Sequence, residues 1–287
     1  MSQSVDPVIV DFVKMHGAGN DFIVMDARAT DFPFEDVRQR TPDLCHRRTG
    51  IGADGILMLR TSDDSDFTMH YLNADGSEAG MCGNGARCLA RFAAGLGMPD
   101  KLRFHVGKHH YKAEVHDEYV SILFPMKPRP VKRVIDGVDW YEIHSGTEHV
   151  VSVDPKYMKA SDATFRKTGC NIRNRIDLFP AGTNVNFASV INQNGLRLVT
   201  YERGVEDLTL ACGTGAIATA IAHIFINLRS TPPDDKTQFK EHHIQVECPG
   251  GPLEVSFNHI CSKSQSTFEN IVLHGPAVAV YQGQFTL

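Results

Sequence analysis

Two stretches of this chain repeat each other, and each begins with a cysteine followed by a glycine-rich turn. The first runs from Met81 to Phe92 and the second from Ala211 to Ala222. Aligned on Cys82 and Cys212, they share the cysteine, two glycines and two alanines. A Cys-Gly-x-Gly turn that opens into an alanine-rich run predicts a loop entering a helix. We therefore expect two similar halves, each with one principal helix that begins beside a cysteine.

A thiol at the start of a helix has a particular chemical environment. It faces backbone N–H groups that lack a partner in the helix, and it lies at the positive end of the helix dipole. This environment favours the thiolate and lowers the pKa of a cysteine below its free value of about 8.5. Two thiols in the same predicted environment indicate a pair that works together.

The bulk composition is that of a soluble globular protein. The 287 residues suffice for one large or two ordinary domains. The net charge of −5 and the scattered Lys and Arg argue against a nucleic-acid surface. We find no apolar run of membrane-spanning length and no secretory signal. Seven cysteines without a CxxC pair favour reduced thiols, so we expect a cytoplasmic protein with no nucleic-acid or membrane partner.

Strand-like segments surround the two expected helices, which should run to about Gly95 and Leu228. A further helix is expected over Phe34 to Arg48, and a hairpin joins Gly182–Ile191 to Leu196–Tyr201. Three successive antiparallel strands are expected at 102–106, 111–115 and 119–124, and later ones at 244–247, 253–257, 271–273 and 277–281. Three prolines between residues 125 and 130 then break the chain and indicate a domain boundary. The fold class is α/β (α+β), with two pseudo-symmetric domains and the site in the cleft between them.

Two other patterns in the chain could be mistaken for binding sites. Gly50 to Gly55 is a literal GxGxxG, but a helical pattern precedes it and a strand follows, the reverse of a dinucleotide site. The histidine pairs at 109–110 and 242–243 have no partner at ligand spacing, so no metal is expected.

The paired thiols suit proton transfer at a carbon next to a carboxylate. Backbone N–H groups of both turns would bind the carboxylate and stabilise the charge that grows on it: Gly83, Asn84, Gly213 and Thr214. With Cys82 and Cys212 on opposite faces of that carbon, one thiolate removes the proton and the other thiol donates one. The stereocentre is inverted, and no cofactor is needed because the dipoles carry the charge.

Alternative uses of these cysteines stay open. Two cysteines can pack as small hydrophobes, and a cysteine can act as a nucleophile beside a histidine, for which His149 is the candidate. The glycines at two matched helix starts favour the acid/base pair. Cys88 lies within the first helix and is expected in the core.

Several motifs, in this order, closely resemble the diaminopimelate epimerase family nearly end to end. They are Met15–Phe22, Asn73–Glu78, Cys82–Cys88, Gly182–Phe187, Tyr201–Gly204 and Ala211–Ala216, together with Pro249–Gly251 and Gly275–Ala277. The resemblance implies two domains, each a curved, mostly antiparallel sheet wrapped around a central helix, with the last strand returning to the first domain. We therefore expect one domain at 1–127 plus 277–287 and a second at 128–276.

The resemblance also implies an activity and a set of site residues. The reaction is the cofactor-independent epimerisation of LL- to meso-diaminopimelate, in lysine and peptidoglycan precursor biosynthesis, with Cys82 and Cys212 as acid and base. Substrate contacts are implied for Asn20, Asn73, Asn184, Glu202 and Arg203, and thiol tuning for His149 and Glu202. The residues alone would make the three asparagines turn residues with positive φ. Glu202 and Arg203 could form a surface ion pair, but their place just before the Cys212 loop argues against it. A small-molecule substrate is expected, and a homodimer stays open.

One loop departs from the family pattern. Before its second-domain histidine the family usually has Gly-Asn-Pro-His, whereas this chain has Gly146-Thr147-Glu148-His149. Thr147 keeps a hydroxyl but has a shorter reach than asparagine. The runner-up function is therefore a racemase of another amino acid, such as histidine, on the same fold.

Overall fold

The computed structural model describes residues 7–157, 159–229, 238–261 and 266–287. The chain forms two compact units, residues 1–120 with 276–287, and residues 121–275. The structure divides the chain after Val120, whereas the boundary expected at the prolines, after residue 127, lies a few residues further along the chain. The difference arises at β8 (Val120–Phe124), which pairs with β17 (Ser266–Gly275) of the second unit instead of with the preceding strand.

The first unit is a sheet whose strands are arranged in the order β18-β1-β2-β3-β4-β6-β7. Among the described strands of this unit, only the pairs β2–β3 and β4–β6 are parallel, and the short β5 also pairs with β4. Its strands are β1 (Ile9–Gly17), β2 (Asn20–Asp26), β3 (Gly55–Arg60), β4 (Phe67–Asn73), β5 (Glu78–Ala79), β6 (Lys101–Val106), β7 (His109–Val115) and β18 (Val278–Thr286). Its helices are α1 (Phe34–Cys45) and α2 (Gly83–Gly95).

The second unit has its strands in the order β9-β10-β11-β12-β13-β15-β16-β17-β8. Here β11–β12 and β13–β15 are parallel, and the short β14 also pairs with β13. Besides β8 and β17, its strands are β9 (Val131–Ile135), β10 (Val138–His144), β11 (Glu148–Ser152), β12 (Asn184–Asn192), β13 (Gly195–Glu202), β14 (Asp207–Thr209), β15 (Gln238–Cys248) and β16 (Gly251–Cys261). The helical segments are η1 (Pro155–Tyr157), α3 (Asp162–Arg173) and α4 (Gly213–Arg229).

The two units repeat one connection pattern. In each, an antiparallel pair leads through an outer helix to a parallel strand, a further antiparallel partner and a short strand. The principal helix follows, and then a strand that returns parallel to the earlier partner and turns back in a hairpin. The pseudo-symmetry expected from the two cysteine turns therefore extends over this whole run of strands and helices in both units, and ends after it, where β17 pairs with β16 but β8 pairs with β17.

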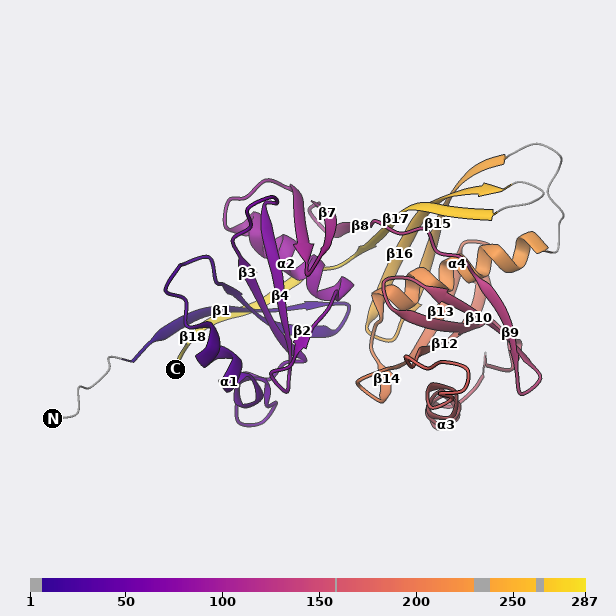
Figure 1. Ribbon diagram of the computed structural model, residues 1–287, viewed down its shortest axis with the longest axis horizontal. Coiled ribbons are helices and arrows are strands. Elements are labelled where there is room, and N and C mark those ends of the chain that lie inside the picture. Colours follow the sequence, from indigo (N-terminus) through magenta and orange to yellow (C-terminus); the bar gives the residue numbers. More distant parts are fainter. Residues whose placement is uncertain (1–6, 158, 230–237, 262–265) are drawn as a thin grey trace. The chain divides into compact units, whose positions relative to one another are not determined.

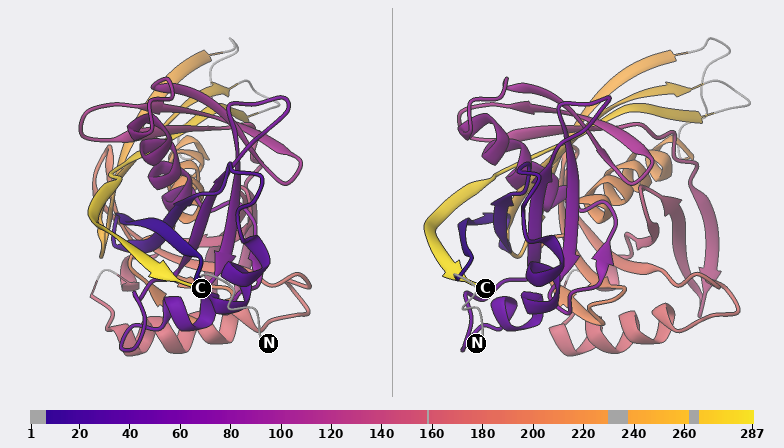
Figure 2. Two further views of the ribbon diagram at one scale, coloured as in Figure 1. Left: turned by 90° about the vertical axis from the view of Figure 1, so that its left-hand side faces the viewer. Right: turned by 60° about the vertical axis from the view of Figure 1, so that its left-hand side comes forward.

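Each principal helix lies against the strands of its own unit, as Figures 1 and 2 show for α2 and α4. In α2 the buried face includes Ala86, Leu89, Ala90 and Ala93, all fully inaccessible. In α4 the residues from 216 to 222 are all fully buried, so this part of the helix is covered on every side, and all of its residues except Thr219 are apolar. Many of these residues are alanines, whose small side chains let a curved sheet approach the helix closely.

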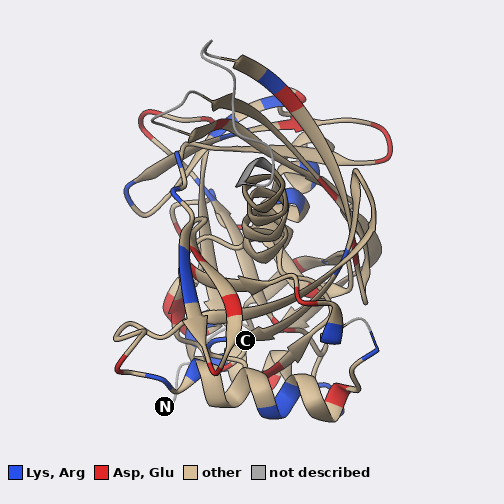
Figure 3. Cartoon of the chain, turned by 90° about the vertical axis from the view of Figure 1, so that its right-hand side faces the viewer, with Lys and Arg blue, Asp and Glu red and all other residues tan. Residues whose placement is uncertain are grey.

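The outer helix of the second unit has the opposite character. α3 is amphipathic, with Phe165 and Ile172 buried and charged residues along its outer surface (Figure 3). It begins at Ser161, whose hydroxyl accepts the backbone N–H of Thr164 and caps the helix. In the described part of the chain, none of the helices is long and apolar enough to cross a membrane.

Several elements differ in extent from the sequence prediction. α1 ends at Cys45, three residues before the expected Arg48. β15 begins at Gln238 and β18 continues to Thr286, so both extend beyond the apolar segments that predicted them. The extra residues at the start of β15 are mostly exposed, which is why hydrophobic patterning missed them.

Candidate active site

Cys82 is the N-cap residue of α2, as the sequence predicts. Its backbone is extended, and Sγ accepts the backbone N–H of Gly85 at 3.4 Å. The same sulfur lies 3.6 Å from the amide oxygen Oδ1 of Asn20, to which the thiol donates. Cys82 is half-buried. A thiol with a helix N–H on one side and an amide oxygen on the other is held in one orientation.

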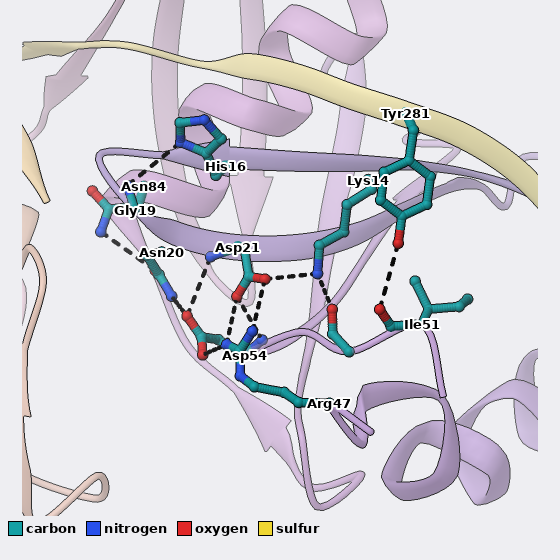
Figure 4. Close-up of polar contacts among 11 residues, drawn as sticks. Lys14, His16, Gly19, Asn20, Asp21, Arg47, Ile51, Asp54, Asn84 and Tyr281 are labelled. Carbon is teal, nitrogen blue, oxygen red and sulfur yellow. Dashed lines mark hydrogen bonds and ion pairs between the residues drawn. The ribbon is translucent and has the colours of Figure 1, made fainter. Parts of the chain in front are cut away.

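Asn20 connects this thiol to a network of charged side chains, drawn in Figure 4. Its Nδ2 donates to Asp54 Oδ2 at 2.6 Å, and Asp54 Oδ1 lies 2.6 Å from Arg47. Asp21 also binds Arg47, at 2.7 Å, and its other oxygen lies 2.7 Å from the buried Lys14 ammonium. Burial raises the pKa of Asp21, but hydrogen bonds from Arg47 and Lys14 outweigh it and lower the pKa to about 2. The Asp21 carboxylate is therefore ionised at neutral pH.

A second amide fixes Asn20 from the helix side. Asn84, in the first turn of α2, is buried and donates from Nδ2 to Asn20 Oδ1 at 3.3 Å. Its own Oδ1 accepts a hydrogen bond of 2.8 Å from the fully buried guanidinium of Arg87. Since a guanidinium can only donate, the orientation of the Asn84 amide is determined.

Asn73 ends β4, and its side chain bonds within its own turn. Its Nδ2 donates to Ser77 Oγ at 3.0 Å. The register of β3 with β4 pairs Asn73 with Gly55, the residue after Asp54. Asn20, Asn73 and Asn184 are all absent from the positive-φ residues of the described chain, so interpreting them as left-handed turn residues is wrong.

Cys212 precedes α4, and its sulfur accepts the backbone N–H of Gly215 at 3.4 Å. Its Sγ also lies 3.6 Å from the hydroxyl oxygen of Thr214. Cys212 is 8% exposed, so this thiol is held by buried neighbours. A Cβ at Gly215 would lie 2.6 Å from Asn186 Oδ1 and 3.2 Å from Cys212 Sγ. The second glycine of this motif therefore leaves the room that the thiol and Asn186 need.

His149 lies behind Thr214 in the second unit. It is fully buried, its Nε2 is 2.9 Å from Thr214 Oγ1, and its Nδ1 is 3.0 Å from Asn186 Nδ2. Burial, with the nearby positive charges of Arg203 and His144, lowers the pKa of His149 to about 3. The imidazole is therefore neutral at physiological pH, and Thr214 lies between it and Cys212.

Asn184 and Arg203 form a second cluster in this unit, together with the unusual loop. Asn184 Nδ2 donates to the carbonyl of Glu148 at 2.9 Å, and its Oδ1 accepts the backbone N–H of Arg203 at 2.9 Å. The Arg203 guanidinium binds Thr147 Oγ1 and Glu148 Oε2, each at 3.0 Å. Glu202 is the half-buried last residue of β13. The two residues that depart from the family pattern thus hold the arginine expected to bind a substrate carboxylate.

The structure therefore brings the predicted residues together in two groups, one in each unit. The first contains Asn20, Cys82, Gly83 and Asn84, and the second contains Cys212, Gly213, Thr214 and His149. Asn184, Glu202 and Arg203 lie at the strand ends of the second unit. Sequence patterns did not single out Asp54, Asn186 or Thr200. Asp54 lies in the glycine-rich stretch from Gly50 to Gly55, whose pattern points only to a nucleotide site, and Asn186 lies in the Gly182–Phe187 motif beside Asn184.

Cys88 is fully buried within α2, as expected for a core residue. Burial raises the pKa of its thiol to about 12, and it does the same for Cys45. Both thiols are therefore protonated and unreactive at neutral pH.

Comparison with known proteins agrees with this site. The model of the family described as diaminopimelate epimerase matches residues 12–128 and 141–280. This chain belongs to the diaminopimelate epimerase family. Diaminopimelate epimerase of Chlorobaculum tepidum is 39% identical over 95% of this chain and 100% of its own length. That of Flavobacterium psychrophilum is 38% identical over 94% of this chain and 97% of its own length. The family membership disfavours the racemase of another amino acid.

Solved structures with low sequence identity share the fold. A hydroxyproline epimerase from Agrobacterium vitis superposes with a TM-score of 0.69 at 13% identity, covering 97% of this chain and 93% of its own. A phenazine biosynthesis protein of the PhzF family from Bacillus anthracis reaches 0.66 at 11% identity, covering 98% and 100%. These likenesses concern the fold alone, and they match the two-domain α+β class expected for diaminopimelate epimerases.

Proposed function

We propose that this member of the diaminopimelate epimerase family interconverts LL- and meso-diaminopimelate, with Cys82 and Cys212 as the two catalytic groups. The observation that carries this proposal is the matched placement of the two thiols. Each sits at the N-terminus of a buried helix and accepts the N–H of the second glycine of its turn, at 3.4 Å in both cases. Helix N-termini bind anions and favour a thiolate, as this chemistry requires.

The reaction needs one group to remove the α-proton and another to return a proton on the opposite face. A thiolate at one cysteine is the base, and the thiol of the other is the acid. The carboxylate next to the α-carbon takes up negative charge as the proton leaves. Backbone N–H groups of the two turns, at Gly83, Asn84, Gly213 and Thr214, stabilise that charge. Loss of one such donor typically costs about 10²–10³ in kcat.

The distal end of the substrate carries a second ammonium and a second carboxylate. Arg203 suits the carboxylate because a guanidinium donates two parallel hydrogen bonds to it, and Glu202 suits the ammonium. Asn20, Asn73 and Asn184 add uncharged hydrogen-bonding groups. Arg203 already binds Glu148 and Thr147, so a substrate carboxylate would exchange with these partners.

Two further features of the sequence bear on the setting of this activity. Seven cysteines without a CxxC pair support the cytoplasm as its compartment. The expected partner is a small amino acid, and a homodimer is an assembly to be tested by light scattering.

The decisive experiment is proton NMR of the reduced protein in D2O, with LL-diaminopimelate and, separately, L-histidine. We expect loss of the α-proton signal with diaminopimelate alone, and loss of the conversion of LL- to meso-diaminopimelate in Cys82→Ala and in Cys212→Ala. Circular dichroism and urea unfolding would verify that both variants fold. Exchange with histidine alone would contradict the proposed substrate. Wild-type turnover in either cysteine variant would contradict the two-thiol mechanism.

A further inference from the structure

The two thiols have opposite hydrogen-bonding partners. Cys82 Sγ lies 3.6 Å from an amide oxygen of Asn20, which can only accept. Cys212 Sγ lies 3.6 Å from a hydroxyl of Thr214, which can donate or accept. In each unit the surrounding network of hydrogen bonds determines the direction of the bond at sulfur.

In the first unit, acceptor-only and donor-only groups determine the direction. The Asp54 carboxylate can only accept, so the Asn20 group 2.6 Å from it is the NH₂. The oxygen of Asn20 must then face the other way, where it accepts from Asn84 and lies beside Cys82. Arg87 holds the Asn84 amide in the matching orientation. Flipping the Asn20 amide would place its oxygen against the Asp54 carboxylate, so the acceptor beside Cys82 is permanent.

In the second unit, the direction follows from Asn186. Its NH₂ lies 3.1 Å from the carbonyl oxygen of Val150, which can only accept, and its Oδ1 accepts from Thr200 at 2.9 Å. The same NH₂ therefore donates to His149 Nδ1 at 3.0 Å. Because the neutral imidazole has one N–H, its hydrogen must be on Nε2.

That tautomer sets the direction of the last hydrogen bond. His149 Nε2–H donates to Thr214 Oγ1 at 2.9 Å, so the oxygen of the hydroxyl is an acceptor on this side. The hydroxyl hydrogen of Thr214 is then directed to Cys212 Sγ. A donor beside sulfur stabilises the thiolate, whereas an acceptor beside sulfur stabilises the protonated thiol.

We propose that in the resting protein the proton resides on Cys82 and that Cys212 is the thiolate. Asn186 and Thr200 are the positioning residues that hold His149 in the tautomer required for this, and Asp54 is the positioning residue for Asn20. The assignment deepens the proposed two-thiol function and rests on it. A substrate whose α-proton faces Cys212 can react with this resting form directly. The opposite epimer requires the proton to move from Cys82 to Cys212 first.

Alkylation of the full-length reduced protein tests this assignment without any substrate. Iodoacetamide labelling over pH 4 to 10, read for each cysteine by peptide mass spectrometry, gives the pH at which each thiol is half-ionised. Midpoints are compared rather than rates, because Cys212 is more buried than Cys82. We expect the midpoint of Cys212 to lie below that of Cys82 by about one pH unit or more, as one charge-stabilising hydrogen bond implies. Equal midpoints, or the reverse order, would overturn the assignment.

Variants test the positioning residues. Thr214→Val should raise the midpoint of Cys212 by about one pH unit and leave that of Cys82 in place, and Thr214→Ser should restore it. Thr200→Val should produce a smaller rise at Cys212, because it releases only the far end of the network. A Cys212 midpoint that is the same in wild type, Thr214→Val and Thr214→Ser would refute the role of the hydroxyl.

The α-proton exchange assay distinguishes failure of this assignment from failure of the proposed function. Ordered midpoints in a protein that exchanges no α-proton would reject the epimerase function and keep the protonation assignment. Exchange of the α-proton in a protein whose Cys82 midpoint lies below that of Cys212 would keep the epimerase function and reject the protonation assignment.

Discussion

Gly215 offers a sharp test of how closely the second thiol is packed, because the structure has no room for a side chain at this position. In Gly215→Ala, the new methyl group would lie 2.6 Å from Asn186 Oδ1 and 3.2 Å from Cys212 Sγ. Ordinary van der Waals contact begins at 3.4 Å, so Asn186 Oδ1 must retreat by about 0.8 Å, the difference between the two distances. That retreat disturbs the hydrogen bond from Thr200, which is 2.9 Å long, and with it the orientation of His149.

Two opposing terms decide the stability of Gly215→Ala. Alanine is favoured over glycine in a helix by about 0.5–1 kcal/mol. Overpacking of a filled interior costs about 1–3 kcal/mol. We therefore expect a net loss of about 1–2 kcal/mol, which leaves the protein folded. Activity should fall much further, by about 10²-fold in kcat, because displacement of catalytic groups by about 1 Å has that effect.

Gly85→Ala is the matched control, because Gly85 occupies the same position after Cys82. The nearest neighbours of its methyl group would be the side-chain methyls of Leu57, at 3.1 and 3.3 Å, and of Met69, at 3.4 Å. These apolar groups can shift at small cost, so we expect kcat within about tenfold of wild type. The assay is the initial rate of α-proton exchange in D2O, with urea unfolding to follow stability. Wild-type kcat in Gly215→Ala, or an equal loss in Gly85→Ala, would refute the reasoning.

Two further predictions follow from the second unit. In Glu148→Gln, Arg203 loses the carboxylate that lies 3.0 Å from it, so the substrate carboxylate meets less competition for the guanidinium. Because the side chains of Arg203 and Glu148 are both partly exposed, their ion pair is weak. We therefore expect KM for diaminopimelate to fall by only about two- to fivefold, with kcat unchanged. Glu206→Gln, which removes a carboxylate 3.1 Å from Arg173, is the charge-matched control. A raised KM in Glu148→Gln would show that the ion pair between Glu148 and Arg203 helps substrate binding instead. His149, with its pKa lowered to about 3 by burial, binds its proton less readily in the folded state than in the unfolded state; stability should therefore be complete above about pH 6.5 and fall towards pH 3, by at most about 1.4 kcal/mol per pH unit for this group. The free energy of unfolding, measured with urea at pH 7, 5.5 and 4.5, should depend less on pH in His149→Gln than in the wild type. An equal dependence on pH in both proteins would mean that the acid sensitivity comes from other histidines, such as His242, whose pKa is lowered to about 4.

Short-range chemistry made much of this protein predictable from its sequence. The glycines after Cys82 and Cys212 indicate helix starts independently of the tertiary fold, because the signal is local in sequence. Both helices begin at these glycines. The Asn192–Gly195 turn specifies the hairpin of β12 and β13 for the same reason. The buried residues Ile244 and Val246 of β15 were visible as an alternating apolar pattern, whereas the mostly exposed start of this strand was not.

Tertiary structure alone decided the polarity of the hydrogen bonds at the thiols. Asn20 meets Asp54 across 34 residues because β2 pairs in parallel with β3, and this pairing turns the amide oxygen of Asn20 towards Cys82. His149 meets Asn186 across 37 residues through the equivalent pairing of β11 with β12, and it meets Thr214 across 65. A cysteine motif specifies a thiol at a helix N-terminus, because the helix dipole is local. Whether that thiol faces a donor or an acceptor depends on strands that are distant in sequence, so it could be read only from the fold.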